Sequence, residues 1–397
     1  MKAIQRLYRS ERGMSMMFVS LGMFGFLAAT TLAIDVGMLM TARTQAQTSA
    51  DAGALAGATA LVYNSFTNRS PNGPAVTSAI NTALANQVIA QPVSVTPSDV
   101  EFLNDPVTGQ NDLVRVTVYR TQARNNAVPT LMAPLIGINQ ADVQATATAI
   151  AGWANAQSCV LPFTIADKWI EKQCAPGQEI CPYDPTDTFD MYNGAGGLLP
   201  NPDIYVPPTS KTDTPTGFNP VTDRGMQIVL KNGTGNNTAS SSWYNPWDIG
   251  NVTGGSAYRA NIQSCNQTPV SVNDMMMPET GNMVGPTKQG TDGLVALDPN
   301  AYWDSTCNCV MGSDTTKYTI SPRIRAVPLY DPAVFAAGKA NGKSGPQLQV
   351  VGFLGFFIEG VAGNGDVTGR ITPALGKIII GGPQVTSGFT QAIMLVK

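Results

Sequence analysis

The chain has 397 residues, a formal net charge of −3 and only 13% charged residues, well below the roughly 25% typical of soluble globular proteins. Without a basic excess there is no footprint for the phosphates of nucleic acid. The chain contains no histidine, which excludes Ser-His-Asp and Cys-His catalysis and all histidine-ligated zinc or iron sites. Its length suggests two or three domains.

The first predicted element is an apolar helix near the N-terminus. Residues 13–34 carry no charge, and as a helix they span about 33 Å, enough for a hydrocarbon core of about 30 Å. The preceding residues include Lys2, Arg6, Arg9 and Arg12, so the positive-inside rule places the N-terminus in the cytoplasm and the bulk of the chain outside. We therefore predict a cytoplasmic basic tail over 1–12 and a transmembrane signal-anchor helix over 13–40.

A cleaved signal peptide is the main alternative. Residues 31–33, Thr-Leu-Ala, form an imperfect small-x-small cleavage site, but the apolar run is longer than the 7–15 residues of an ordinary signal core. A plain buried core helix is a further alternative, and it leaves the basic cluster unexplained. Asp35, at the outer membrane edge, either snorkels to water or pairs with a partner.

A stripe of small residues follows from Thr41 to Tyr63. Helical residues four apart share a face, and small side chains make that face flat, so that another backbone can approach closely. The predicted helix-packing face consists of Ala42, Ala46, Ala50, Gly53, Ala54, Gly57 and Ala58. The pattern allows packing on the chain's own globular domain or on neighbouring helices of an assembly.

Two motifs in this region resemble the N-terminal signature of Tad-like (TadE/TadG-type) Flp pilus-assembly proteins. They are Ile-Asp-Val-Gly at 34–37 and Ala-Asp-Ala-Gly-Ala-Leu-Ala-Gly-Ala at 50–58, after Arg12-Gly13 and an apolar run. A looser likeness continues to about residue 152. The resemblance implies a membrane-anchored accessory of a tight-adherence pilus, whose partners are other pilus-assembly proteins and inner-membrane lipid. The chain length fits the longer TadG type better than TadE.

Two features of related proteins are absent. Prepilins carry a glutamate five residues after the glycine of their cleavage site, whereas Phe18 stands at that offset from Gly13. This difference argues against processing by a prepilin peptidase and against a role as the main fibre subunit. The sequence also lacks the Asp-x-Ser-x-Ser metal motif that some TadG-like proteins carry in a von Willebrand A domain.

Residues 41–152 predict the stalk helix and a small α+β layer packed on it. Apolar residues four apart predict a helix over Ala75–Ile89, and Pro and Gly predict a short helix over Pro129–Gly137. Alternating or β-branched residues predict strands at 93–95, 99–103, 113–119 and 143–150. The order α, β, β, α, β suggests an α+β layer, which the resemblance leads us to expect to be pilin-like.

Residues 153–397 predict a loop-rich β domain, with strands at Gly225–Leu230, Tyr318–Val327, Leu348–Glu359, Asp366–Thr372 and Ala392–Val396. An even number of cysteines in an exported chain predicts disulfides, from Cys159, Cys174, Cys181, Cys265, Cys307 and Cys309. Six cysteines allow 15 pairings. We expect Cys307 and Cys309, one residue apart, to bond elsewhere rather than to each other.

Trp243, Tyr244 and Trp247 form an aromatic cluster in this half. Amphipathic aromatic residues on loops favour recognition, although they also fill the cores of small β domains. We keep the cluster as a candidate contact surface. Acid-rich loops at 184–190 and 363–366 offer oxygen ligands of the kind Ca²⁺ takes, but neither has EF-hand spacing.

The sequence therefore predicts an α+β protein: a long transmembrane and stalk helix, a small pilin-like α+β layer, and a loop-rich, disulfide-stapled β domain. The common hydrolase motifs are absent, so we expect no enzyme and no catalytic, cofactor-binding or metal-binding residues. The predicted function is a structural or accessory component of a Tad/Flp-type pilus, with no small-molecule substrate. The predicted location is the bacterial inner membrane, single-pass, with the bulk periplasmic or at the cell surface. The alternative is a binding module or adhesin that the N-terminal helix merely anchors.

Overall fold

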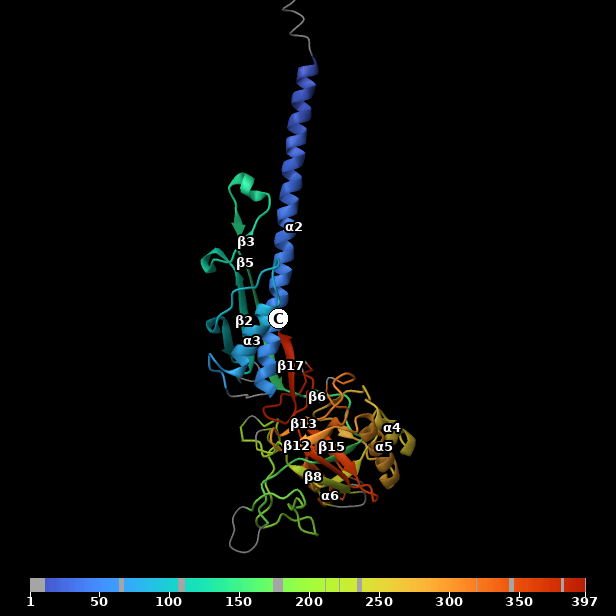
Figure 1. The fold of residues 1–397 in the computed structure, drawn as a ribbon. Helices are drawn as coiled ribbons and strands as arrows, with labels where there is room; N and C mark the ends of the chain where they lie inside the picture. Colours follow the sequence, from blue (N-terminus) through green and yellow to red (C-terminus); the bar gives the residue numbers. More distant parts are fainter. Residues whose placement is uncertain are drawn as a thin grey trace, which may run out of the picture. The chain divides into compact units, whose positions relative to one another are not determined.

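The computed structural model describes residues 11–63, 68–105, 111–173, 181–210, 212–220, 222–233, 238–318, 320–342, 346–379 and 382–396. The chain divides into two compact units (Figure 1). The first comprises Met1–Asp105, Gly109–Ile150 and Met394–Lys397, and the second Pro106–Thr108 and Ala151–Ile393. The chain thus returns to its first unit at the C-terminus.

The first unit is built around α2, a helix from Glu11 to Tyr63. The predicted apolar anchor and the predicted small-residue stalk form one uninterrupted helix, drawn in blue in Figure 1. Its 53 residues make a rod about 80 Å long. The first half is exposed along its length, whereas one face of the second half, from Ala42 onward, is buried. The change of environment therefore follows the change of composition.

The short helix α3 (Pro74–Ala85) packs on the second half of α2. Pro74 stands in its first turn, where a missing backbone N–H costs nothing. The predicted helix over Ala75–Ile89 is confirmed in its first part and wrong at its end. Ile89 and Ala90 have positive φ values of 48° and 57°, which a right-handed helix of L-residues does not tolerate.

A four-stranded sheet in the order β1-β2-β5-β17 has most of its residues in this unit. Its strands are β1 (Val100–Leu103), β2 (Leu113–Arg120), β5 (Val143–Trp153) and β17 (Gln391–Val396). β2 pairs antiparallel with both β1 and β5. The strand predicted at 93–95 is wrong, because that segment makes only a single bridge from Ser94 to Tyr119. Two single 3-10 turns, η1 (Pro97–Asp99) and η2 (Gln122–Arg124), lead into β1 and out of β2.

A short hairpin lies between β2 and β5. Its strands β3 (Val128–Pro129) and β4 (Gln140–Ala141) pair antiparallel, and its tip carries the 3-10 turn η3 (Ala133–Ile136). The helix predicted over Pro129–Gly137 is therefore reduced to one turn, which Gly137 ends with a φ of 87°.

The second unit contains a closed β-barrel. Six strands pair in a ring in the order β15-β14-β7-β9-β8-β16, because β15 pairs with both β14 and β16. They are β7 (Phe163–Ala166), β8 (Gln227–Asn232), β9 (Trp243–Pro246), β14 (Ile324–Tyr330), β15 (Leu348–Val361) and β16 (Val367–Ile371). Alternate residues of these strands share one core cluster, such as Leu354, Phe356 and Ile358 of β15. The strand period of two thus fills the barrel interior.

Most of the strands predicted for this half are confirmed, with shifted ends. The strand predicted over Tyr318–Val327 begins only at Ile324, because Ser321 donates a hydrogen bond to the Asp298 carboxylate (2.6 Å) instead of entering the sheet. Three helices were not predicted: α4 (Gly255–Gln263), α5 (Val284–Leu297) and α6 (Pro332–Ala340). The remaining short strands are β6 (Ala156–Gln157), β10 (Val270–Ser271), β11 (Met275–Met276), β12 (Tyr302–Asp304) and β13 (Cys309–Met311).

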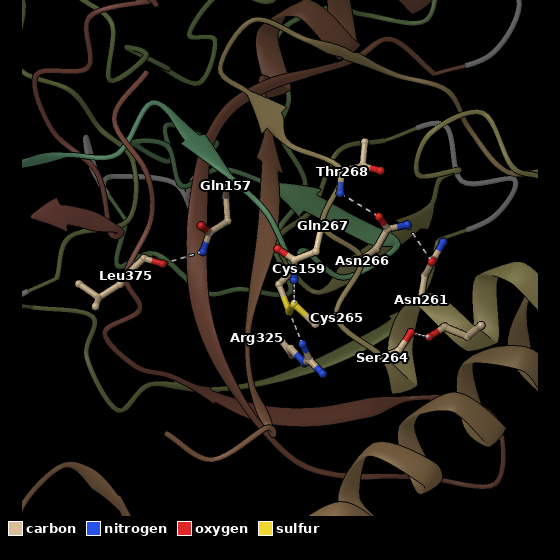
Figure 2. The surroundings of a disulfide bond; sticks show 11 residues. Gln157, Cys159, Asn261, Ser264, Cys265, Asn266, Gln267, Thr268, Arg325 and Leu375 are labelled. Atoms are coloured by element: carbon tan, nitrogen blue, oxygen red, sulfur yellow. Dashed lines mark hydrogen bonds between the residues drawn. A yellow bond between two sulfur atoms is a disulfide. The ribbon is translucent and has the colours of Figure 1, made fainter. Parts of the chain in front are cut away.

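Disulfides join two pairs of described cysteines. Cys159 bonds to Cys265, with Arg325 beside the Cys159 sulfur (Figure 2). Cys307 bonds to Cys309 across the β12–β13 turn, with 5.2 Å between their Cα atoms. The expectation that these two bond elsewhere is therefore wrong: a φ of 49° at Asn308 turns the chain back between them. Cys181 is also disulfide-bonded, and Cys174 lies outside the described residues.

Candidate functional site

The exposed first half of α2 is the most unusual surface among the described residues. Its apolar side chains face outward, with Met16 74% and Phe24 75% exposed. By length and composition, α2 is the one helix among the described residues that could cross a membrane. Large apolar groups are not left in water at this density unless a membrane or a partner covers them. This half of the helix is therefore the first part of the candidate site.

The second part is Asp35, where the exposed half of α2 ends. Its carboxylate accepts hydrogen bonds from three consecutive backbone N–H groups of the β3–β4 hairpin: Leu131 (2.8 Å), Met132 (3.0 Å) and Ala133 (2.5 Å). Asp35 is 4% exposed as a result. N–H groups at the start of a helical turn have no partner within that turn, so the carboxylate satisfies them. Of the two predicted alternatives for Asp35, the structure shows a partner, and it belongs to the same chain.

The third part is the small-residue face of α2, which the chain itself covers. Ala42, Ala46, Ala50, Ala54 and Ala58 are at most 1% exposed. Gly53 and Gly57 lie against α3 and β2: a Cβ on Gly57 would come within 2.9 Å of Val114 Cγ1 and 3.2 Å of Ala79 Cβ. The structure therefore shows the intramolecular alternative, and in this conformation the face leaves no space for a neighbouring helix.

Polar groups fix the register of α2 against the rest of the first unit. The buried hydroxyl of Ser49 donates to the carbonyl of Ala83 (2.9 Å) near the end of α3, which also accepts from the backbone N–H of Asn86 (3.1 Å). The side-chain oxygen of Gln45 accepts from the N–H of Ile89 (2.7 Å), in the strained turn after α3. Asp35, Gln45 and Ser49 thus tie α2 to two segments of the same unit.

Two of the three residues of the aromatic cluster in the second unit are buried. Tyr244 is 0% and Trp247 4% exposed, and only Trp243 is partly exposed. The Tyr244 ring packs 5.2 Å from the Phe163 ring inside the barrel, and the Trp247 indole N–H donates to the carbonyl of Leu161 (3.2 Å). The prediction of a contact surface at Tyr244 and Trp247 is wrong. Pairing of β9 with β7 and β8 makes Tyr244 part of the barrel, and Trp247, just after β9, is buried in a second core cluster.

One carboxylate of the first unit is held in an unfavourable environment. Asp112 is 1% exposed, and its Oδ1 atom has no hydrogen-bond partner. Burial, together with the charge of Asp105, raises the pKa of Asp112 to about 7. By contrast, burial would raise the pKa of Asp99, but hydrogen bonds from Arg124 and Thr96 lower it below its usual value.

Buried acids in the second unit hold the loops that follow β7. Asp167 accepts from the backbone N–H of Phe218 (3.1 Å) and the hydroxyl of Tyr205 (3.0 Å), and burial raises its pKa to about 6. Asp203 accepts from the N–H groups of Lys172 and Asp190. Burial and the neighbouring Glu171 raise the pKa of Asp203 to about 7. These carboxylates are engaged as acceptors for loop backbone, an arrangement that supports a structural role.

Metal binding has no support in the described part of the chain. Within those residues no group of three or more cysteines, aspartates or glutamates has an arrangement that could hold a metal ion. Asp184, of the first acid-rich loop, instead accepts from the N–H (2.8 Å) and hydroxyl (2.7 Å) of Thr186. Such a local turn is the ordinary use of aspartate in loops.

Sequence reasoning missed the hairpin as the partner of Asp35. The only signal was weak: residues 128–141 carry no charge and contain two prolines and a glycine. The hydrogen bonds from Leu131 and Ala133 to Asp35 join residues 96 and 98 positions apart. Because the donors are backbone N–H groups, the types of residue at these positions do not reveal the contact.

Comparison with protein families gives a match at the N-terminal helix. Residues 13–60 match the family model described as putative Flp pilus-assembly TadE/G-like. The match covers α2 from its apolar start to the end of its small-residue face, so it includes Asp35, Gly53 and Gly57. No curated protein and no solved structure gave a significant match. The match supports a place in the Tad-type Flp pilus-assembly family.

Proposed function

We propose that the chain is a membrane-anchored structural component of a Tad-type Flp pilus-assembly system and acts through contacts with other proteins of that system. The observation that carries the proposal is the family match over 13–60, which lies within α2. That helix presents an exposed apolar half and then becomes the core of a small α+β domain. Such a rod displays a folded unit at a fixed distance from a membrane.

The proposed topology follows from charge and cysteine chemistry. The basic residues before the apolar segment place the N-terminus in the cytoplasm, and both folded units then lie outside the inner membrane. The disulfides Cys159–Cys265 and Cys307–Cys309 belong to an oxidising compartment such as the periplasm. Among TadE and TadG, the length of the chain favours the longer TadG type.

The proposed role is not enzymatic. The chain lacks histidine altogether. The carboxylate oxygens of Asp167 and Asp203 accept hydrogen bonds from backbone N–H groups and from a tyrosine hydroxyl. The alternative of an anchored adhesin has lost its main candidate surface, since Tyr244 and Trp247 are buried. We therefore prefer the structural role to the adhesin.

The test uses two variants of α2 in a strain that lacks the native gene. Leu21→Arg combined with Phe24→Arg places two charges near the middle of the apolar segment, at about 2.5–3.5 kcal/mol each. The control is Thr48→Arg, a change at an exposed position of the second half of α2. We measure the carbonate-resistant membrane fraction and count pili by electron microscopy.

We expect the double variant to leave the membrane fraction and the cells to lose pili, while Thr48→Arg cells keep both. Normal piliation of cells without the gene would refute the proposed function. Normal membrane retention of the double variant would refute the anchoring.

A further inference from the structure

The hairpin tip, residues 130–139, carries exposed apolar side chains beside a helix that is itself exposed and apolar. Leu131 is 63% and Ile138 50% exposed, comparable with Ile34 (48%) and Met40 (64%) on α2. The whole hairpin from Val128 to Ala141 contains no charged residue. An uncharged tip with outward apolar side chains is unusual for a surface turn, which ordinarily is polar.

The contact with Asp35 sets the height of this tip along α2. Three N–H groups of the tip bond to a residue that directly follows the charge-free segment 13–34. After Asp35 the next charge on the helix is Arg43. Residues 13–42 therefore carry one charge, and its carboxylate is covered by the tip.

The length of the apolar segment indicates where Asp35 would lie in a membrane. Residues 13–34 span about 33 Å, which matches a hydrocarbon core of about 30 Å. The two headgroup layers add about 10–15 Å to the core, so each is about 5–7 Å thick. When the core is filled by 13–34, Asp35 lies at the outer boundary of the hydrocarbon and the residues that follow it, from Val36, enter the outer headgroup layer.

We propose that the hairpin tip is a second membrane contact, with Leu131 and Ile138 inserted into the outer headgroup layer beside α2 and Asp35 acting as the positioning residue. This placement rests on the proposed function, since it requires α2 to be embedded in a membrane. The tip has the composition that an interface accepts: apolar Leu131 and Ile138, and the neutral polar residues Thr130 and Asn139.

The tip is also held by hydrogen bonds of its own. The N–H of Thr130 donates to the carbonyl of Asn139 (3.1 Å), and the Thr130 hydroxyl donates to the carbonyl of Ile138 (2.6 Å). These bonds close the base of the turn, and Asp35 binds its N–H groups from the helix side. Two fixed contacts, a helix and a neighbouring tip, would restrain the tilt and rotation of the rod in a way that a single span does not.

Lipid is favoured over a second copy as the occupant, because the exposed surface of the tip continues the exposed apolar surface of α2 at Ile34 and Met40. Lipid that covers α2 near Ile34 and Met40 would therefore also cover the tip.

The test uses the purified full-length chain in vesicles of phosphatidylethanolamine and phosphatidylglycerol. Single cysteines are introduced at Ile138 (tip), Leu21 (middle of the apolar segment) and Glu101 (exposed, on β1) and labelled with an environment-sensitive fluorophore. Nitroxide-labelled lipids then report contact with lipid by quenching. We expect about twofold quenching or more at positions 21 and 138, and none at 101.

The three positions separate the outcomes. Quenching at 21 without quenching at 138 overturns the placement of the tip and leaves the anchoring intact. No quenching at 21 refutes the anchoring and the tip contact together. A label at 138 that is shielded from water but not quenched by lipid labels also overturns the proposal, because a protein neighbour then covers the tip. In the Asp35→Ala variant we expect quenching at 138 to fall while quenching at 21 persists; unchanged quenching at 138 would refute the positioning role.

Discussion

Gly57 offers the sharpest test of how the small-residue face of α2 is used. The face packs against α3, whose residues Ala75, Val76, Ala79 and Ala83 are at most 2% exposed. A Cβ at Gly57 would lie 2.9 Å from Val114 Cγ1 and 3.4 Å from the carbonyl oxygen of Ala75. The substitution Gly57→Leu places four carbons where even the first is too close.

The expected size of the effect follows from overpacking. Inserting carbons into a closed interface costs about 1–3 kcal/mol, with about 2 kcal/mol at the middle of the range. The gain in helix propensity does not enter, because α2 stays helical whether or not α3 is attached. A destabilisation of the α2–α3 contact by about 2 kcal/mol corresponds to a roughly 30-fold higher population of the open form.

Hydrogen exchange by mass spectrometry measures this directly. The peptide that covers α3 should exchange roughly 30-fold faster in Gly57→Leu wherever exchange requires α3 to detach. The matched control is Gly37→Leu on the same helix, since a Cβ at Gly37 meets nothing within 4 Å. We expect no change in the α3 peptide for that variant.

Unchanged exchange of α3 in Gly57→Leu, together with a loss of pili, would refute the intramolecular use of the face. It would mean that the face docks to neighbouring helices in the assembly. Equal effects of the two variants would show that helix propensity, not packing, is being measured.

Two further predictions concern charge and covalent links. The pKa of Asp112 is raised to about 7, whereas an unfolded aspartate titrates near 3.9. The folded state then binds more protons between these values, so stability falls as the pH rises from about 4 to about 7. We expect Asp112→Asn to increase the free energy of unfolding of the first unit by on the order of 2 kcal/mol at pH 8 and by little at pH 4; urea titrations that show equal effects at both pH values would contradict this. The Cys159–Cys265 bond joins residues 106 apart and the Cys307–Cys309 bond residues 2 apart, so chain entropy assigns them about 5 and about 2 kcal/mol. Replacing the first pair by serine should lower the urea midpoint of the second unit clearly more than replacing the second pair, and the reverse order would rule out the entropic explanation.

Local patterns predicted α2 well. Its apolar half and its small-residue half both follow from residue type and helical spacing, which depend only on neighbours in the sequence. The strands β2, β5 and β15 were also predicted, because they are long and rich in alternating or β-branched residues. In each case the signal lies within one element.

Features that depend on distant pairing could not be predicted in this way. Tyr244 and Trp247 stand among Ser, Asn, Pro and Asp, a composition typical of a loop. Tyr244 is buried because β9 is closed into the barrel by β8, the strand before it, and by β7, which lies far away in the chain. Trp247 is buried against Leu161 of the same distant region. The barrel is closed by the pairing of β15 with β16, in addition to its pairing with β14. No pattern of residue types in the sequence indicates that the sheet closes on itself.

The Cys307–Cys309 bond shows the same limit at short range. Spacing alone suggested two separate partners, but a single residue, Asn308 with a φ of 49°, brings the two sulfurs together. Asparagine tolerates the left-handed region better than most residues. A turn between two short strands was therefore a possible reading of the segment, yet neither β12 nor β13 is long enough to be detected from sequence.

The family match and the structure together change where partner contacts should be sought. The matched segment 13–60 contains Asp35, Gly53 and Gly57, and all three are used inside the chain, by the hairpin and by α3 and β2. Their residue types are explained by folding: a carboxylate for three free N–H groups, and glycines for close backbone approach. A partner that recognised these residues would have to unfold the first unit to reach them. The surfaces left for partners in the proposed assembly are therefore the exposed ones, including the outward face of α2, so pilus-defective variants that still fold should map to exposed residues and not to the small-residue face.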